Sequence, residues 1–379
     1  MSAQVAHRKV IPTVARRPNT PGRVSNVIDV SPPTLSVLDQ SPISEGSTGS
    51  QALHQTIELA RLADRLGYQR YWVAEHHGGP MLAGPSPEVL IGPIAAATER
   101  IRVGSGGVML PHYSPFKVAE SFSLLAGLYP ERIDLALGRA SGTDPMTAHA
   151  LQRDRTNPMP DDFPNQLAEL LAYLEDRLLA NHPFARLAKA LPGLPEKPEP
   201  WLLGSSQQSA VWAGELGLPY AFADFINPDG APIAELYRDK FVDSERLAAP
   251  KLAIGAWALA ADTEEEAQEL ASSSMMAMRE LRAGRLIAVP PVEKALRYLE
   301  RQDEAVPAGG GRRMTLGTGE QVRAGLEELA AQYGAEEVIV VTITHDPEAR
   351  RHSYELIADA FGLEGASESA EQRGGLLPR

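Results

Sequence analysis

Three ionisable residues follow a short apolar run in the first third of the chain. Residues 71–74 (Tyr-Trp-Val-Ala) are typical of a buried strand, and Glu75, His76 and His77 come directly after it, before a Gly-Gly-Pro break. A histidine has an unperturbed pKa of about 6.5, so it can exchange a proton near neutral pH. In a parallel α/β protein, active sites lie at the carboxyl ends of the strands. The triplet is therefore a candidate acid/base centre; the alternative is a solvated loop start or an ion-paired structural histidine.

A glycine pair follows another predicted strand. Residues 101–105 are typical of a strand, and the chain then continues through Gly106 and Gly107 to a proline at position 111. Consecutive glycines at a strand end indicate that the backbone approaches another group closely or adopts a positive φ. This segment is a second candidate part of a site.

A third strand end carries hydroxyl groups. The predicted strand over 201–204 leads into Ser205, Ser206 and Ser209 at the start of a predicted helix. Free backbone N–H groups, the helix dipole and serine hydroxyls together favour an anion such as phosphate. The alternative is that Ser205 or Ser206 only caps the helix.

An arginine lies where it could complete such an anion site. Arg139 directly follows the predicted strand over 133–138, so it belongs to the same edge of the sheet. A guanidinium group binds phosphate through two parallel hydrogen bonds. An ion pair with Asp134 or Asp144 is the alternative.

The sequence does not predict a metal site. Glu75 and His76 could be ligands and His112 a third, but zinc sites need three or four ligands and the nine histidines form no HExxH motif. Cysteine is absent, which excludes thiolate ligands, cysteine nucleophiles and disulfides.

The elements around these residues predict an α/β fold. Eight short apolar runs alternate with helical patterns, and continuous Val/Ile/Leu strands are typical of a parallel sheet that is covered on both faces. We expect a single-domain (β/α)8 TIM barrel with insertions. The competing open, doubly wound sheet is weakened by the lack of a G-x-G-x-x-G turn after the first strand. The predicted strands are residues 35–38, 70–75, 101–105, 133–138, 201–204, 220–223, 252–259 and 338–342.

Composition divides the chain into a basic head and an acidic body. Residues 1–33 are Pro-rich and carry a net charge of +4, whereas the whole chain carries −13, which leaves −17 for the rest. We expect a disordered tail over 1–33, the barrel over 34–362 and a flexible tail over 363–379. A strongly acidic body argues against nucleic-acid binding. No apolar run reaches the roughly 18 residues of a membrane helix, and the head lacks the apolar core of a secretory signal, so we expect a cytoplasmic protein.

Taken in order, these motifs resemble the bacterial luciferase-like flavin-dependent monooxygenase family. The resemblance covers roughly residues 34–362. Each motif alone is weak, and the ordered set is specific. The residues that carry it are 35–42, 70–77, 103–111, 133–139, 204–206 and 217–219.

The resemblance implies an FMN-dependent oxidoreductase, specifically a monooxygenase that uses reduced FMN and dioxygen on a small organic substrate. It implies that His76 is the catalytic acid/base, oriented by Glu75 or another carboxylate, and that the Gly106–Gly107 pair lies against the flavin ring. Some members have a non-proline cis peptide at that place. Arg139 and the serines Ser205, Ser206 and Ser209 would hold the FMN phosphate. A homodimer is also implied, and the FMN is either bound by the protein or delivered in reduced form by a flavin reductase.

Some positions depart from the family pattern, and other functions stay open. Gly138 replaces a reactive cysteine of luciferase, Asn165 replaces a second phosphate-binding arginine, and residues 317–320 lack the proline of a Gly-Thr-Pro-Glu motif. The alternatives are a deazaflavin-dependent hydride-transfer oxidoreductase, a non-catalytic flavin-binding protein and a metal-dependent barrel hydrolase.

Overall fold

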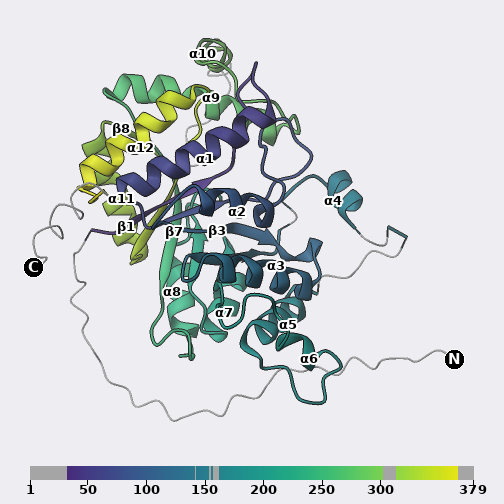
Figure 1. Cartoon of the computed structure of the whole chain (residues 1–379). Helices are drawn as coiled ribbons and strands as arrows, with labels where there is room; N and C mark the ends of the chain where they lie inside the picture. The colour runs from purple at the N-terminus through teal and green to yellow at the C-terminus, as the bar shows by residue number, and fades with distance from the viewer. Residues whose placement is uncertain (1–31, 141, 153–154, 157–161, 302–312, 366–379) are drawn as a thin grey trace, which may run out of the picture. The chain divides into compact units, whose positions relative to one another are not determined.

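The fold was analysed in a computed structural model that describes residues 32–140, 142–152, 155–156, 162–301 and 313–365 (Figure 1). Nearly all of the two predicted tails, 1–33 and 363–379, lies outside these residues.

Eight parallel strands close into a barrel, which confirms the predicted fold. Going round the barrel, β1 to β7 follow chain order, and β9 pairs with both β7 and β1. The strands are β1 (Thr34–Asp39), β2 (Arg70–Val73), β3 (Arg102–Met109), β4 (Ile133–Gly138), β5 (Glu199–Gly204), β6 (Tyr220–Ala223), β7 (Leu252–Ala260) and β9 (Glu337–Val341).

Helices lie outside the ring of strands (Figure 1). In the described part of the chain they are α1 (Gly49–Leu66), α2 (Pro87–Ala96), the 3-10 helix η1 (Leu110–His112), α3 (Pro115–Leu128), α4 (Pro145–Leu151), α5 (Phe163–Glu175), α6 (Ala185–Ala188), α7 (Gln207–Glu215), α8 (Ala231–Lys240), α9 (Glu264–Arg282), α10 (Val292–Glu300), α11 (Gly319–Tyr333) and α12 (Pro347–Phe361). None of them is both long and apolar enough to cross a membrane.

A ninth strand, β8 (Met314–Gly317), is absent from the sequence-based prediction of eight. It pairs with the carboxyl half of β7, from Trp257 to Ala260, beyond the point where β6 ends. β8 has four residues, three of them only partly buried, so it lacks the apolar signature of the barrel strands. It is a strand because it pairs with β7, and not because its own sequence favours one.

Alternating side chains separate two cores. On β1, Leu35 and Val37 join the large core between sheet and helices, whereas Leu38 joins the smaller core inside the barrel. On β2, Val73 likewise faces the helices and Trp72 the interior. This follows from the two-residue period of a strand.

The interior also holds a buried charged network near the amino ends of the strands. Arg70 on β2 donates from Nη1 to Asp134 on β4 and from Nε to Glu337 on β9, both at 2.7 Å. The Ser36 hydroxyl on β1 donates to the same Glu337 oxygen, and Arg102 on β3 donates to Asp134 at 2.8 Å. Five strands are therefore tied together at this end of the barrel.

Replacing Arg70 by methionine tests this network. Arg70→Met leaves Glu337 without its cation and leaves Arg102 as the one cation bonded to Asp134, and a buried charge that loses its partner costs about 3–5 kcal/mol. We expect that loss in the free energy of unfolding by urea. The matched control is Arg61→Met, because Arg61 pairs with Glu58 on the exposed face of α1; that change should cost about 0–1 kcal/mol. Equal losses in the two variants would contradict the assignment.

Candidate active site

The segment after β2 places its ionisable side chains on two sides of the barrel wall. Its backbone stays extended: Ala74 N donates to Asp39 O, and His76 N donates to Gly84 O. We extend the two-residue period of β2 through residue 77 to infer the side on which each side chain falls. His76 follows Trp72 and Ala74, which are in the barrel interior, whereas Glu75 and His77 lie on the side of Val73.

Glu75 is fully buried within the wall. Its Oε1 accepts from His77 Nε2 at 2.8 Å and its Oε2 from Met109 N at 2.9 Å. The Tyr113 hydroxyl also bonds to this carboxylate, and burial together with the nearby charge of Glu75 raises the pKa of Tyr113. The expectation that Glu75 orients His76 is therefore wrong. Residues i and i+2 of an extended segment lie on the same face, so Glu75 bonds to His77 instead.

His76 has a different environment. Its Nδ1 is 3.3 Å from the carbonyl oxygen of Gly142. A carbonyl only accepts, so this bond places the proton of a neutral imidazole on Nδ1 and leaves Nε2 as the acceptor. Burial lowers the pKa of His76, the nearby His77 lowers it further, and the Gly142 carbonyl opposes both. At neutral pH the ring is neutral and can take up a proton.

The glycine pair forms the non-proline cis peptide that the resemblance implies. The bond lies between Gly106 and Gly107, where the pairing of β3 with β4 changes register. A Cβ on Gly106 would lie 2.6 Å from Leu38 Cδ1, and one on Gly107 would lie 2.6 Å from the Ala136 carbonyl oxygen. Neither position accommodates a side chain, so close packing requires both glycines.

The serines after β5 begin helix α7. Ser206 is the N-cap and forms a capping box with Ser209. Ser209 is buried, and its hydroxyl also lies 2.9 Å from the Tyr220 hydroxyl. A Cβ on Gly204 would lie 2.1 Å from Ser209 Oγ, so Gly204 is needed for this fold-back. The capping alternative is therefore correct for Ser206. Capping leaves the first N–H groups of the helix without intrahelical acceptors, so it is compatible with an anion site.

Arg139 and Ser205 lie near the same helix. The Arg139 guanidinium carbon is 5.7 Å from the ring centroid of Trp212, which is on α7. The carbonyl oxygen of Ser205 accepts from Asn227 Nδ2 at 3.0 Å. The structure thus brings Arg139 and the three serines around one helix.

Asp134 and Asp144, the alternative ion-pair partners of Arg139, and Asn165, which replaces a phosphate-binding arginine of the family, have local partners. Asp134 accepts from Arg70 and Arg102, and Asp144 caps α4 by accepting from Met146 N at 2.9 Å. Asn165 is exposed and donates to Asp162 at the start of its own helix α5.

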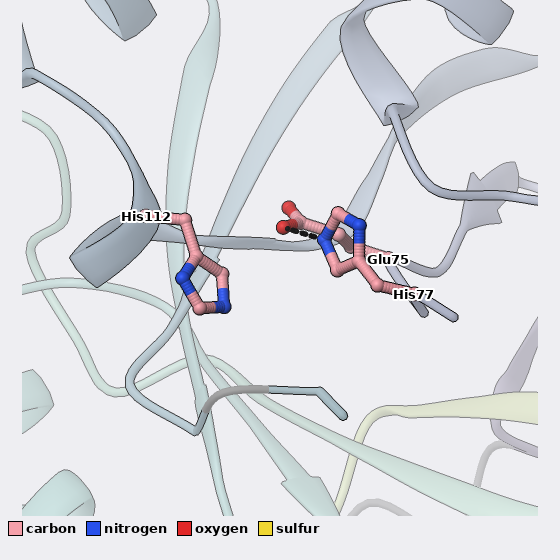
Figure 2. Close-up of side chains that lie close together, drawn as sticks. All are labelled: Glu75, His77 and His112. Atoms are coloured by element: carbon pink, nitrogen blue, oxygen red, sulfur yellow. Dashed lines mark hydrogen bonds and ion pairs between the residues drawn. The ribbon is translucent and has the colours of Figure 1, made fainter. Parts of the chain in front are cut away.

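A possible metal-ligand group is present, with a different membership from the set weighed in the sequence. Figure 2 shows Glu75 and His77 from the segment after β2 and His112 from η1. One ligand atom from each lies within 4.8 Å of the others. The His77 and His112 rings meet edge-on, with centroids 5.6 Å apart. His76 is not a member, because it faces the other side of the wall.

Three residues of the site were not singled out from the sequence: Met109, Tyr113 and Gly142. Met109 contributes only a backbone N–H, for which no side-chain signal exists. Tyr113 follows His112 directly, so its place next to a candidate residue was the available clue. Gly142 has a φ of 61°, and a Cβ there would lie 2.8 Å from the Glu75 carbonyl oxygen.

Comparison with known proteins identifies the family. The sequence profile of luciferase-like monooxygenases matches residues 34–337. The chain belongs to the luciferase-like monooxygenase family. It is 46% identical to the YwcH protein of Bacillus subtilis, over 86% of this chain and 99% of that protein. It is 38% identical to the N-acetyl-S-alkylcysteine monooxygenase of Bacillus subtilis, over 86% of this chain and 97% of that enzyme.

Several solved structures have the same fold. The crystal structure of apo-MsnO8 has a TM-score of 0.80 and 40% identity, covering 89% of this chain and 99% of that one. At lower identity only the fold is shared. The oxygenating constituent of 3,6-diketocamphane monooxygenase, in complex with FMN, is 19% identical (TM-score 0.65) and an F420-dependent secondary alcohol dehydrogenase 13% (TM-score 0.55). Family membership supports a flavin monooxygenase.

The lowered pKa of His76 predicts how stability depends on pH. Below about pH 6.5 the unfolded chain binds a proton at His76 that the folded chain resists, so stability should fall as the pH drops towards the folded pKa. His76→Gln should therefore lose less stability than the wild type between about pH 7.5 and about pH 5.5, measured by urea unfolding.

The control is His352, whose pKa is raised by its bond to Asp262. Its pair stabilises the protein below the unfolded pKa, so His352→Gln should change the pH dependence in the opposite sense. Parallel curves for wild type and His76→Gln would contradict the environment assigned to His76.

Proposed function

We propose that this protein is an FMN-dependent monooxygenase that uses reduced FMN and dioxygen on a small organic substrate. The observation that carries the proposal is the arrangement at the carboxyl ends of the strands. His76 follows the end of β2 and lies 3.3 Å from the Gly142 carbonyl oxygen, the Gly106–Gly107 cis peptide lies on the adjacent β3, and Arg139 lies beside α7. Membership of the luciferase-like monooxygenase family supports this chemistry.

The donor groups around α7 fit the phosphate of FMN. The N-terminus of the helix provides N–H groups and the positive end of its dipole, Ser205 and Ser206 provide hydroxyls, and Arg139 provides a cation. The Ser209 hydroxyl is bonded within the capping box and to Tyr220. Ser209 would therefore support this site by fixing the start of the helix. Deazaflavin coenzymes also carry a phosphate, so this donor set alone does not select FMN.

The residues of the chain would supply positioning and proton transfer. Reduced FMN, when bound, supplies the electrons that activate dioxygen. His76 Nε2 would accept or return a proton at the substrate, while the Gly142 carbonyl holds Nδ1. Glu75 bonds to His77 and to the Met109 N–H rather than to His76. It would therefore act as a positioning residue that fixes His77 and the Met109 backbone.

The apolar residues inside the barrel would exclude water from this reaction. They continue past the strand ends into the loop that holds Met81 and into the end of α9 with Ala277 and Met278. These residues do not select one substrate. The relative named N-acetyl-S-alkylcysteine monooxygenase makes S-alkylated cysteines the first compounds to screen by oxygen uptake.

Removing the imidazole tests the role of His76. His76→Ala should lower turnover by about 100-fold or more, because general acid/base catalysis contributes about 10²–10⁴-fold. Its affinity for FMN should change by less than about twofold, since His76 does not touch the phosphate site. Turnover is followed as substrate-dependent oxygen uptake. His54→Ala, on the exposed face of α1, is the matched control. Unchanged turnover in His76→Ala would remove the role.

Removing the guanidinium tests the phosphate site. Arg139→Ala should weaken binding of FMN by about tenfold or more, the cost of a lost charge-assisted hydrogen bond, and should leave riboflavin binding nearly unchanged. Fluorescence titration of both flavins measures this. Arg65→Ala, exposed in the last turn of α1, is the control. Equal weakening of FMN and riboflavin would separate Arg139 from the phosphate.

The same titration with oxidised FMN, anaerobically reduced FMN and a deazaflavin coenzyme discriminates the cofactors. Tighter binding of reduced than of oxidised FMN favours a reaction with flavin supplied by a reductase. Binding of the deazaflavin alone would withdraw the oxygen chemistry. A flavoprotein that binds FMN but never consumes oxygen would be non-catalytic.

A homodimer is part of the proposal. Apolar side chains are exposed on two neighbouring helices: Val89 on α2 at 69%, and Leu124 and Leu128 on α3 at 49% and 63%. A second subunit would cover such side chains.

A further inference from the structure

We propose that Glu75, His77 and His112 bind one divalent transition-metal ion, such as Zn²⁺. The three side chains offer one carboxylate oxygen and two imidazole nitrogens within 4.8 Å of one another (Figure 2). In a tetrahedral site, bonds of about 2.0–2.1 Å put neighbouring ligand atoms about 3.3 Å apart. Binding therefore requires His112 to move closer and the 2.8 Å contact between Glu75 and His77 to open.

The carboxylate is already held in the manner of a metal ligand. Glu75 Oε2 accepts from Met109 N at 2.9 Å, and the Tyr113 hydroxyl also bonds to the carboxylate. Oε1 faces His77. Hydrogen bonds of this kind orient metal-binding carboxylates and are as important as the ligands themselves. Glu75 can therefore offer Oε1 to a cation while its backbone and its second oxygen stay fixed.

The local charge also favours a cation. Glu75 is fully buried, and a second carboxylate, Glu88 on α2, is close enough to interact with it electrostatically. Burial and the charge of Glu75 raise the pKa of Glu88, whereas a charged His77 and Lys117 on α3 oppose this. A divalent ion between the two histidines would balance the negative charge on this side of the wall.

The donor set selects the kind of ion. Two imidazoles and one carboxylate suit Zn²⁺, Co²⁺ or Ni²⁺, whereas Mg²⁺ and Ca²⁺ prefer oxygen ligands throughout. Three protein ligands leave the fourth position for water. The His77 side chain is 11% exposed, so the group is not sealed from solvent.

This site is separate from the proposed flavin site. Glu75 and His77 flank His76 in the chain but lie on the opposite side of the barrel wall. Metal binding therefore does not depend on the flavin chemistry, and its test needs no substrate.

The experiment is a titration of the untagged full-length chain, dialysed against a chelator, with Zn²⁺ by calorimetry and with Co²⁺ by visible absorption. The chain has no cysteine, so any tetrahedral Co²⁺ spectrum must come from nitrogen and oxygen ligands. We expect one ion per chain. His112→Ala and His77→Ala should each weaken its binding by at least about tenfold, since even residues that only support ligands contribute about 10–100-fold. His54→Ala, an exposed histidine of α1, should leave binding unchanged.

His112 decides the outcome if His77→Ala fails to fold, because His112 is only partly buried on a short helix and its variant should keep the melting temperature of the metal-free protein. One-to-one binding that His112→Ala weakens supports the site. Binding that is equally strong in His112→Ala and His54→Ala, binding of several weak equivalents, or no binding overturns it. Because FMN affinity is measured separately in the same variants, failure of this site leaves the proposed function untouched.

Discussion

The two-residue period of the chain from Arg70 to His77 is the constraint that organises both ends of this barrel. Every second side chain of this segment belongs to the interior: Arg70 and Trp72 within β2, then Ala74 and His76 beyond it. At about 3.3 Å per residue, Arg70 and His76 are separated by about 20 Å. The ionic network therefore lies at the start of β2 and the candidate catalytic base lies three residues past its end, and the same period assigns Glu75 and His77 to the other face.

The charged network lets the interior be polar at one end and apolar at the other. Arg70, Asp134 and Glu337 satisfy one another near the amino ends of the strands, and Trp72 Nε1 also donates to Asp134 at 2.9 Å. Above them the interior is filled by tryptophan, alanine and aliphatic side chains. His76 thus lies above an apolar layer, where burial lowers its pKa. If Asp134 and Glu337 lay next to His76, their negative charges would favour the imidazolium form instead.

The sequence predicted the parts of the fold that depend on local pattern. Eight apolar runs became the eight barrel strands, because a strand buried on both faces has a recognisable composition. Strand β8 was missed because pairing with the end of β7 creates it. In the site, residue types gave His76, Arg139 and the serines as candidates, but the partner of Glu75 was assigned wrongly. Met109 and Gly142 act through backbone atoms, which leave no trace in residue type.

The start of helix α7 is compatible with both roles that the sequence left open for its serines, helix capping and anion binding. Capping and anion binding both involve the same serines. The capping box uses the Ser206 hydroxyl and the Ser209 N–H, while the first two N–H groups of the helix lie outside it. Ser209 then turns back over Gly204 towards Tyr220 and fixes where the helix begins. A rigid start is what an anion site requires, because its N–H groups must point at one place before the ligand arrives. For the proposed phosphate site, capping in this helix is therefore a condition rather than an alternative.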